Sequence, residues 1–280
     1  MDYLYYPGCS LEGTAMEYDR SCRALAAALD MDLVEIPDWT CCGATAAQCV
    51  DELLSVVLPA RNLALAEKTD PGKDILVPCS GCYLNLETAR QRIRTDPVLR
   101  VRVNQILAPD GLAVTGSNRV RHLLDVLSRD GAVDQVTARA GTNMAGLVVA
   151  PYYGCQCLRP FHAFDDPEQP RSMDALIRAA GAAVLAWDMG AACCGASTAA
   201  TSPGVGQARV TQILDQAGSA QAVVTVCPMC QMNLERFQTS PVPILYLPQF
   251  LGLAMGLPSE SLGCGLNLSD IGPVVMRGSP

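Results

Sequence analysis

Ten of the fourteen cysteines form one spacing pattern that occurs twice in the chain. Each copy has a single cysteine, then a vicinal Cys-Cys pair followed by glycine, and then a C-x-x-C motif. The first copy is Cys9, Cys41, Cys42, Cys79 and Cys82, and the second is Cys155, Cys193, Cys194, Cys227 and Cys230. A structural zinc site is closed by four ligands, so five thiols exceed what one zinc ion requires. Five thiolates suit a multi-iron sulfur cluster better.

The vicinal pairs also favour a cluster over a single ion. Two adjacent sulfurs tend to diverge, so they are more naturally shared between different irons. One isolated pair would be interpreted as a strained disulfide or as two buried cysteines. Two pairs, each preceding a glycine (Gly43, Gly195) and each accompanied by a C-x-x-C, favour metal binding instead. A lone C-x-x-C is typical of thioredoxin-like redox sites, but here each one belongs to a larger set.

Four cysteines lie outside the duplicated pattern: Cys22, Cys49, Cys157 and Cys264. We interpret Cys22, on an apolar helical stretch, as a small buried hydrophobe. Cys157 lies two residues after Cys155 and has no counterpart in the first copy. It is a candidate spare ligand or redox thiol. The sequence assigns no role to Cys49 or Cys264.

Few other side chains are placed to take part in chemistry. His162 follows Cys155 by seven residues and is a candidate proton donor to a reduced sulfur. Arg159 is a candidate anchor for an anionic substrate group. His122 lies in a helical pattern, RVRHLLDVLSRD, and is interpreted as a packed or surface histidine. Trp39 and Trp187 precede the two vicinal pairs and are interpreted as walls that exclude water.

Composition limits the function classes. The net charge is −8 and there is no basic run, which argues against nucleic-acid binding through phosphate neutralisation. The N-terminus MDYLYYPGCS lacks the features of a secretory signal. No apolar run reaches the roughly 18 residues of a membrane span. Fourteen cysteines without an export signal predict thiol or metal chemistry in the cytoplasm rather than a disulfide scaffold.

A nearly constant offset relates the two cysteine sets. Cys9 and Cys155 are 146 residues apart, and Cys79 and Cys227 are 148 apart. Local sequence repeats as well: TCCGAT resembles ACCGAS, and CSGCYLNLE resembles CPMCQMNLE. A fixed offset with shared local sequence indicates internal duplication. We therefore expect two similar domains, residues 1–145 and residues 146–280.

Short apolar runs precede the cysteine groups, and amphipathic stretches follow or separate them. The expected strands are 3–6, 33–36, 75–77, 147–150, 184–187 and 223–226, and the expected helices are 16–29, 53–67, 173–180 and 205–214. Alternating strands and helices predict an α/β fold with parallel sheets. Because the carboxyl ends of parallel strands share one rim, cysteines far apart in sequence are expected to meet there. The C-x-x-C motifs are expected at helix N-termini, where backbone N–H groups favour thiolates.

The motifs together resemble the cysteine-rich CCG domain, and the doubled form resembles the B subunit of heterodisulfide reductase. The resemblance runs through YYPGCSLEGTAMEYDRS, PDWTCCGAT, PCSGCYLNL, YYGCQCLRP, DDPEQPRSMDAL and LYLPQFLGLAMGL. Cys157 is extra to the family pattern, and the tail from Gly263 departs from it. The resemblance implies that each five-cysteine set holds a noncubane [4Fe-4S] cluster, and that the two clusters face each other across a substrate pocket.

The same resemblance implies a reaction and partners. In methanogens the substrate is the mixed disulfide of coenzyme M and coenzyme B. Two electrons arrive through an iron–sulfur C subunit from a flavin-containing A subunit, and relatives in sulfur metabolism act on other disulfides. The expected function is therefore two-electron disulfide reduction, or dithiol oxidation in reverse. Two alternatives stay open: an electron-relay CCG subunit of a quinone-linked dehydrogenase complex, and a non-enzymatic scaffold of two zinc-stabilised domains.

Overall fold

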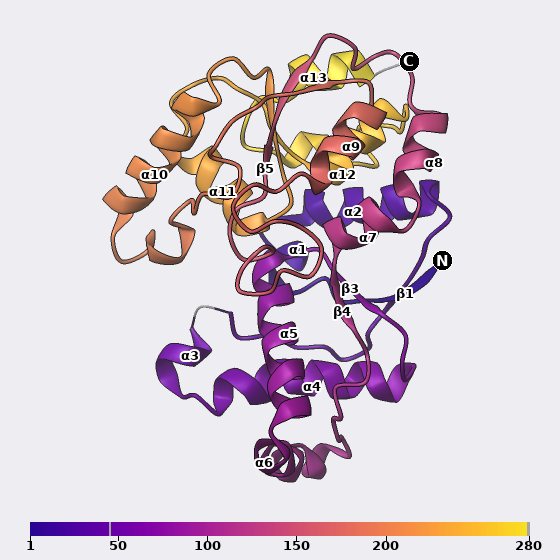
Figure 1. Ribbon diagram of the computed structural model, residues 1–280, viewed down its shortest axis with the longest axis vertical. Coiled ribbons are helices and arrows are strands. Elements are labelled where there is room, and N and C mark those ends of the chain that lie inside the picture. Colours follow the sequence, from indigo (N-terminus) through magenta and orange to yellow (C-terminus); the bar gives the residue numbers. More distant parts are fainter. Residues whose placement is uncertain (45, 279–280) are drawn as a thin grey trace.

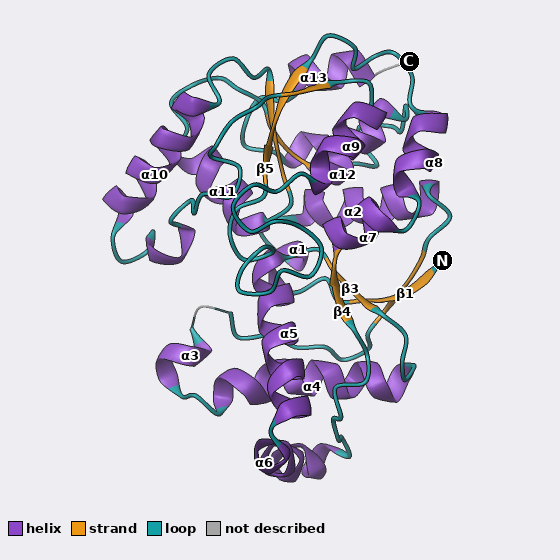
Figure 2. Cartoon of the chain, viewed as in Figure 1, coloured by secondary structure: helices purple, strands orange, loops and turns teal. Residues whose placement is uncertain are grey.

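Two four-stranded parallel sheets form the framework of the protein (Figures 1 and 2). The structure is a computed structural model that describes residues 1–44 and 46–278. The first sheet has the order β2-β1-β3-β4, with β1 Asp2–Tyr5, β2 Asp32–Glu35, β3 Ile75–Val77 and β4 Val120–His122. The second has the order β6-β5-β7-β8, with β5 Val148–Tyr152, β6 Ala183–Val184, β7 Ala222–Thr225 and β8 Ile244–Tyr246. The identical strand order confirms the predicted α/β fold and its duplication.

Helices connect and cover the strands of each sheet. In the first half they are α1 Cys9–Glu12, α2 Met16–Ala28, α3 Ala47–Val50, α4 Leu54–Thr69, α5 Ser80–Thr95, α6 Pro97–Leu107, α7 Leu123–Arg129 and α8 Ala132–Arg139. In the second half they are α9 Ser172–Ala179, α10 Pro203–Gln216, α11 Pro228–Phe237, α12 Leu247–Ala254 and α13 Gly272–Gly278. Short 3₁₀ turns occupy Ala108–Asp110, Ala196–Thr198 and Cys264–Leu266. No helix of the described ranges is both long and apolar enough to cross a membrane.

The two halves exchange helices across their junction. Helix α7, which follows the last strand of the first sheet, packs on α9 of the second half. Helix α12, which follows the last strand of the second sheet, packs on α2 of the first half. Figure 1 shows α2 and α7 lying beside α9 and α12, and one continuous buried core runs through both halves. The predicted domain boundary at residue 145 stays a prediction, because these contacts tie the two halves together.

The structure corrects two expectations about local structure. The strand expected at 184–187 is only the short β6, Ala183–Val184. The segment around His122 does not lie within a helix. Val120–His122 forms strand β4, and α7 begins only at Leu123 with His122 as its N-cap. A three-residue strand is too short to show an alternating pattern, and the apolar residues that follow it dominate the helical periodicity. The matching last strand of the second sheet, Ile244–Tyr246, was likewise not predicted.

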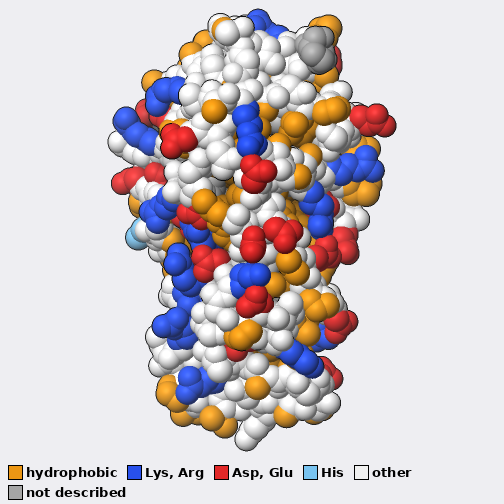
Figure 3. Space-filling view, turned by 90° about the vertical axis from the view of Figure 1, so that its right-hand side faces the viewer, with side chains coloured by type: hydrophobic (Ala, Val, Ile, Leu, Met, Phe, Trp, Pro, Cys, Tyr) orange, Lys and Arg blue, Asp and Glu red, His pale blue; other side chains and the backbone are white. Residues whose placement is uncertain are grey.

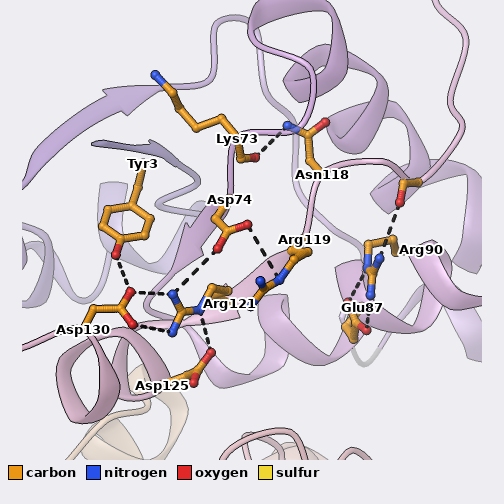
Figure 4. A network of polar contacts seen from close by, with 11 residues as sticks. Tyr3, Lys73, Asp74, Glu87, Arg90, Asn118, Arg119, Arg121, Asp125 and Asp130 are labelled. Carbon is orange, nitrogen blue, oxygen red and sulfur yellow. Dashed lines mark hydrogen bonds and ion pairs between the residues drawn. The ribbon is translucent and has the colours of Figure 1, made fainter. Parts of the chain in front are cut away.

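A buried arginine joins β4, the edge strand of the first sheet, to α7. Arg121 on β4 pairs with Asp125 at 2.7 Å and with Asp130 at 2.5 Å, and Asp130 also accepts a hydrogen bond from Tyr3 (Figure 4). These groups hold the edge of the sheet without taking part in the cysteine sites. Elsewhere charge is dispersed: on the face drawn in Figure 3, acidic and basic side chains are interspersed. That face is therefore mixed in charge rather than uniformly basic.

Candidate metal centre

The first cysteine set assembles at the carboxyl ends of the first sheet. Strand β1 leads into Cys9, and β3 leads into Cys79, the N-cap of α5. The Sγ atoms of Cys42 and Cys82 lie 3.4 Å apart, and those of Cys9 and Cys41 lie 3.8 Å apart. Cys42, Cys79 and Cys82 are buried, whereas Cys9 and Cys41 are exposed. The structure therefore brings the five predicted residues of the first set together.

The second set repeats this arrangement. The Sγ atoms of Cys194 and Cys230 lie 3.6 Å apart, which matches the Cys42–Cys82 contact position for position. Cys155 and Cys193 are linked by a thiol hydrogen bond, as are Cys227 and Cys230. Cys227 is the N-cap of α11, so both C-x-x-C motifs begin helices as expected. Cys193 is the most exposed thiol of the second set, and Cys194, Cys227 and Cys230 are buried.

Two glycines let the backbone pass close to the sulfurs. A Cβ atom at Gly8 would lie 2.7 Å from Cys82 Sγ, and one at Gly154 would lie 2.8 Å from Cys230 Sγ. Both glycines also have positive φ angles, of 74° and 71°. A side chain at either position would intrude on the sulfur of the neighbouring C-x-x-C. Only glycine therefore lets the backbone lie against these sulfurs at the two equivalent positions.

Hydrogen bonding holds some of the thiols in the ionised form that binds metals. Thiol hydrogen bonds from Cys41 and Cys82 lower the pKa of Cys42 to about 4. The thiol of Cys155 lowers the pKa of Cys193 to about 5, and nearby Arg209 and Arg159 add to this effect. The donor thiols shift in the opposite direction: the pKa of Cys41 is raised by its bond to Cys42. Thiolate character at the vicinal pairs is what a metal site needs.

The helix N-terminus contributes in the second set. A hydrogen bond from Cys230 lowers the pKa of Cys227 to about 7, and the backbone N–H groups of Met229 and Cys230 act in the same direction. The nearby Ser80 of the first half also lowers the pKa of Cys227, so one half of the chain influences the thiol chemistry of the other. Amide donors at a helix start stabilise negative charge on sulfur, as the sequence predicted.

The donor set fits a cluster better than one ion. The sulfurs approach one another in pairs around each buried C-x-x-C. A tetrahedral zinc site needs four ligands around one point. A set of five thiols fits an iron–sulfur cluster.

The two C-x-x-C turns meet at the junction of the halves. The Tyr18 hydroxyl donates to the carbonyl oxygens of Pro78 and Val226, 3.1 Å away in both cases. These carbonyls immediately precede Cys79 and Cys227. The Ser80 hydroxyl reaches the same Val226 carbonyl at 3.3 Å. These hydrogen bonds hold the segments that lead into the two C-x-x-C motifs against each other, so the two cysteine sets lie back to back.

Aromatic side chains fill the rest of this junction in equivalent pairs. Tyr18 stacks on Tyr246 with ring centroids 4.0 Å apart, and Phe164 stacks on His122 at 6.1 Å. Tyr18 and Phe164 each follow the lone cysteine of their half by nine residues. His122 is fully buried, which lowers its pKa to about 3, and its Nε2 lies 3.2 Å from Ser80 Oγ. The space directly between the two C-x-x-C turns therefore holds protein side chains.

A cavity opens outward beside the first set. It has a volume of 570 Å³ and is lined by the exposed thiols Cys9 and Cys41, the Trp39 ring, and acidic side chains that include Glu12 and Glu35. Trp39 packs edge-on against Tyr6, and Trp187 packs in the same way against Tyr152. Tyr6 and Tyr152 each precede the lone cysteine by three residues. Trp39 lines the cavity beside the first set, as expected. Trp187 lines a different cavity, together with Tyr153 and Asp188, and its role as a wall of the second set stays a prediction.

The remaining sequence candidates lie at varying distances from the thiols. Cys22 is buried in α2, in agreement with its interpretation as a small hydrophobe. Cys157 is buried, and its thiol donates to the Tyr153 carbonyl at 3.3 Å. His162 is exposed in the loop before α9, near Asp166, and its role as a proton donor stays a prediction. Arg159 is held by Glu168 and by the Ala191 carbonyl.

Sequence reasoning overlooked the residues of the junction. Tyr18, Ser80 and His122 are all buried and all touch the segments that carry the C-x-x-C motifs. Ser80 could have been noticed, because it lies inside a C-x-x-C motif. Tyr18 comes from a helix and His122 from an unpredicted strand. These residues meet only because helices of each half pack on the other half.

Comparison with known proteins places this arrangement in a family. The family model described as CCG, a cysteine-rich domain, matches residues 3–87 and again residues 149–235. The chain belongs to the cysteine-rich CCG domain family. The two matched regions contain all ten cysteines of the duplicated pattern, and the family confirms the resemblance drawn from the motifs.

Several relatives of this CCG protein match along nearly their whole length. The 8-methylmenaquinol:fumarate reductase membrane anchor subunit of Wolinella succinogenes is 34% identical, over 96% of this chain and 97% of its own. The B subunit of the Ferredoxin/F420H2-dependent CoB–CoM heterodisulfide reductase of Methanosarcina acetivorans is 26% identical, over 94% and 92%. A protein of Archaeoglobus profundus, described as like the B subunit of heterodisulfide reductase, is 27% identical, over 93% and 92%.

A solved structure shares the fold. A hypothetical protein from Helicobacter pylori superposes with a TM-score of 0.74 at 14% sequence identity. The match covers 94% of this chain and 50% of that one. At this identity the likeness concerns the fold alone.

Proposed function

We propose that this chain is the iron–sulfur subunit of an oxidoreductase complex and that each half holds one noncubane [4Fe-4S] cluster. The ligands are the five cysteines of each set, ten in all. The observation that carries the proposal is the repeated geometry: the Cys42–Cys82 and Cys194–Cys230 contacts recur at equivalent positions, each beside a glycine whose backbone lies against the C-x-x-C sulfur. When bound, such clusters supply and accept electrons.

The chain itself positions and shields these sites. The buried C-x-x-C thiols are fixed at helix N-termini, and Trp39 lines the cavity beside Cys9 and Cys41. Tyr18 and Ser80 hold the two C-x-x-C turns back to back. In this proposal both cofactors lie close to one junction, which suits the transfer of an electron pair.

The reaction we propose is the two-electron reduction of a disulfide, or dithiol oxidation in reverse. Relatives named for the B subunit of heterodisulfide reductase support it, as does the presence of a five-thiol set in both halves. Breaking one S–S bond takes two electrons and yields two thiolates, and two equivalent sites supply that number. The disulfide is the CoM–CoB heterodisulfide or a different one. The partners in this proposal are an iron–sulfur C subunit and a flavin-containing A subunit, and the location is the cytoplasm.

A second candidate function is quinone-linked electron transfer without a disulfide. Two observations favour it. The relative with 34% identity is named as a subunit of a menaquinol:fumarate reductase. The space between the C-x-x-C turns is filled by Tyr18, Ser80 and His122, all buried, so a disulfide has to reach the sites from outside. In this case the chain passes electrons between a quinone pool and a partner protein.

One experiment tests the cofactors and separates the two reactions. Protein purified without oxygen is assayed for metal, and the proposal expects about eight irons per chain with equal acid-labile sulfide. Finding close to one zinc per half and no sulfide supports the scaffold alternative instead. Pre-reduced protein is then mixed with disulfides, including the CoM–CoB heterodisulfide, or with a menaquinone analogue. Reoxidation by a disulfide supports the first reaction, and reoxidation by the quinone alone supports the second.

A further inference from the structure

The backbone of the first vicinal pair is held by hydrogen bonds from two side chains that are not ligands. The Tyr6 hydroxyl donates to the Thr40 carbonyl at 2.7 Å. The Asn85 side chain donates from Nδ2 to the Cys42 carbonyl at 3.1 Å. Thr40 directly precedes the vicinal pair, and Cys42 is its second member. The two bonds therefore hold the chain on both sides of Cys41.

The second half repeats both hydrogen bonds. The Tyr152 hydroxyl donates to the Ala192 carbonyl at 2.6 Å, and Asn233 Nδ2 donates to the Cys194 carbonyl at 2.7 Å. In each half the tyrosine precedes the lone cysteine by three residues, and the asparagine follows the last cysteine of the C-x-x-C by three residues. We call these two donors of each half the Tyr–Asn clamp.

Each clamp joins the three chain segments that carry the cysteines of its set. Tyr6 directly follows β1, and Tyr152 is the last residue of β5, so both lie just before the lone cysteine. Asn85 lies in α5 and Asn233 in α11, the helices that begin at the two C-x-x-C motifs (Figure 1). The vicinal pair lies in a loop between these elements. Because the bonds end on main-chain carbonyls, they leave the thiols free to bind metal.

The clamp acts on the buried member of each vicinal pair. Cys42 and Cys194 are 1% and 4% exposed, and each lies against the second sulfur of the C-x-x-C, at 3.4 Å and 3.6 Å. The first members, Cys41 and Cys193, are exposed. One clamp bond ends on the carbonyl of the buried cysteine itself. Loss of its donor therefore frees the cysteine whose sulfur contacts the C-x-x-C.

The tyrosine hydroxyls are suited to act as donors. Tyr6 and Tyr152 are both fully buried. Burial, together with the nearby cysteines of the same half, raises the pKa of both phenols above the ordinary value. Both hydroxyls therefore keep their protons and can donate to their carbonyls. A buried carbonyl that loses its donor is left unsatisfied, which is costly in the protein interior.

The helix that follows each vicinal pair adds one further donor, at a different place in the two halves. In the first half, Asn62 of α4 donates to the same Thr40 carbonyl at 2.9 Å and accepts from the Thr40 N–H at 2.8 Å. The equivalent residue of α10 is Val210, which has no side-chain donor. The preceding residue, Arg209, donates to the Cys193 carbonyl at 3.2 Å instead. The carbonyl bound by the clamp tyrosine thus has a second donor in the first half.

Side chains that orient metal ligands from outside the coordination sphere affect metal binding strongly. Their removal typically lowers metal affinity by about 10–100-fold. We propose that the Tyr–Asn clamps are positioning devices for the metal centres: Tyr6 and Asn85 hold the first vicinal pair in its ligand geometry, and Tyr152 and Asn233 hold the second. This inference rests on the proposed function, since it concerns the retention of two clusters. Each clamp acts on the cluster of its own half.

Iron release from variants of the asparagines tests the clamps. Asn85→Leu and Asn233→Leu each remove one donor, add no charge and keep a side chain of similar size. Protein loaded with clusters is mixed with an iron chelator without oxygen, and iron release is followed together with the EPR signals. In N85L we expect about half of the iron to leave about 10–100-fold faster than in the wild type, while the signal of one cluster decays at that rate. N233L is expected to do the same to the other cluster.

The tyrosine variants must fall into the same two groups. Tyr152→Phe is expected to speed the loss of the cluster that N233L affects. Tyr6→Phe is expected to act on the cluster that N85L affects, but more weakly than Y152F acts on its own, because Asn62 still donates to the Thr40 carbonyl. A general loss of stability would not sort the variants by half, since unfolding releases iron from both sites.

Two matched controls remove hydrogen bonds of the same kind away from the cysteines. Asn104→Leu removes a bond from an asparagine side chain to the Val114 carbonyl. Tyr3→Phe removes a hydroxyl from the same strand that leads to Tyr6, where it donates to Asp130. Both controls are expected to release iron from both clusters at the rates of the wild type.

The outcomes separate this inference from the function on which it rests. Wild-type protein without acid-labile sulfide overturns the proposed function and the inference with it. If the wild type holds two clusters, wild-type release rates in N85L and N233L overturn the inference alone, and so does an equal effect of either variant on both clusters. Should a leucine variant fail to fold, Y6F and Y152F carry the test, because each removes a single oxygen atom. They must then affect different clusters for the inference to stand.

Discussion

The hydroxyl of Tyr18 lies 3.1 Å from the carbonyl oxygen of Val226, 208 residues away in the chain. The same hydroxyl also serves the Pro78 carbonyl, so a single buried tyrosine joins the segments that lead into both C-x-x-C motifs. This contact explains how two halves built on separate sheets keep their cysteine sets in a fixed relationship. Substitution of Tyr18 is therefore the most direct test of this contact.

Tyr18→Phe is expected to destabilise the protein by about 1–3 kcal/mol, because it leaves buried carbonyl groups with fewer donors. The measurement is the free energy of unfolding from a denaturant titration. Tyr246→Phe is the matched control, since it removes a hydroxyl from the ring stacked on Tyr18 and leaves both carbonyl bonds in place. Equal stabilities for the two variants would contradict the role of the Tyr18 hydroxyl.

Gly8→Ala and Gly154→Ala are each expected to empty one site. The new methyl group would lie 2.7 Å from Cys82 Sγ in one variant and 2.8 Å from Cys230 Sγ in the other. Iron and acid-labile sulfide per chain are expected to fall by about half in each, on the basis of two four-iron clusters. Gly72→Ala serves as the control, because Gly72 also has a positive φ angle, 90°, but a Cβ there meets nothing within 4 Å. Full iron content in G8A and G154A would show that these positions do not border the sites.

His122 is expected to make stability depend on pH. Burial lowers the pKa of His122 from its ordinary value of 6.5 to about 3. Below pH 6.5 the unfolded chain binds a proton that the folded protein does not, so stability falls with pH until about pH 3. Between pH 6.5 and 5 this loss is about 2 kcal/mol. Burial also raises the pKa of Glu17 to about 7, which acts in the opposite direction over part of this range.

The comparison of wild type with His122→Gln isolates the histidine, because Glu17 is common to both. The unfolding free energy of each protein is measured at pH 6.5 and pH 5. The variant is expected to lose less stability than the wild type over this interval. The same loss in both proteins would mean that His122 is protonated in the folded state.

Neither half is expected to fold alone. Helix α2 of the first half is covered by α12, and α9 of the second half is covered by α7. Residues 1–145 and residues 146–280, expressed separately, would each leave a buried apolar face in water. Circular dichroism and gel filtration are expected to show unfolded or aggregated fragments, and co-expression is expected to recover a stable pair. A monomeric first half with a cooperative thermal transition would count against this exchange.

Much of the fold was predictable because each local pattern agreed with the final structure. The apolar run Ile75–Val77 forms the strand expected of it, and helices α2 and α4 lie within a few residues of their predicted bounds. The fourth strand of each sheet was not predictable, since Val120–His122 and Ile244–Tyr246 are three residues long and run directly into apolar helices. Their identity as strands depends on pairing with β3 and β7.

The sequence by itself determined the two cysteine sets, their duplication and the chemistry of thiolate ligands, because residue type and spacing carry that information directly. Only the tertiary structure decided that the sets stand back to back and that their surroundings differ. Tyr18, Ser80 and Arg209 carry no motif that marks them. Their effect depends on which carbonyl or sulfur lies within a few ångströms once helices of one half pack on the other. Local sequence does not determine distances between residues far apart in the chain.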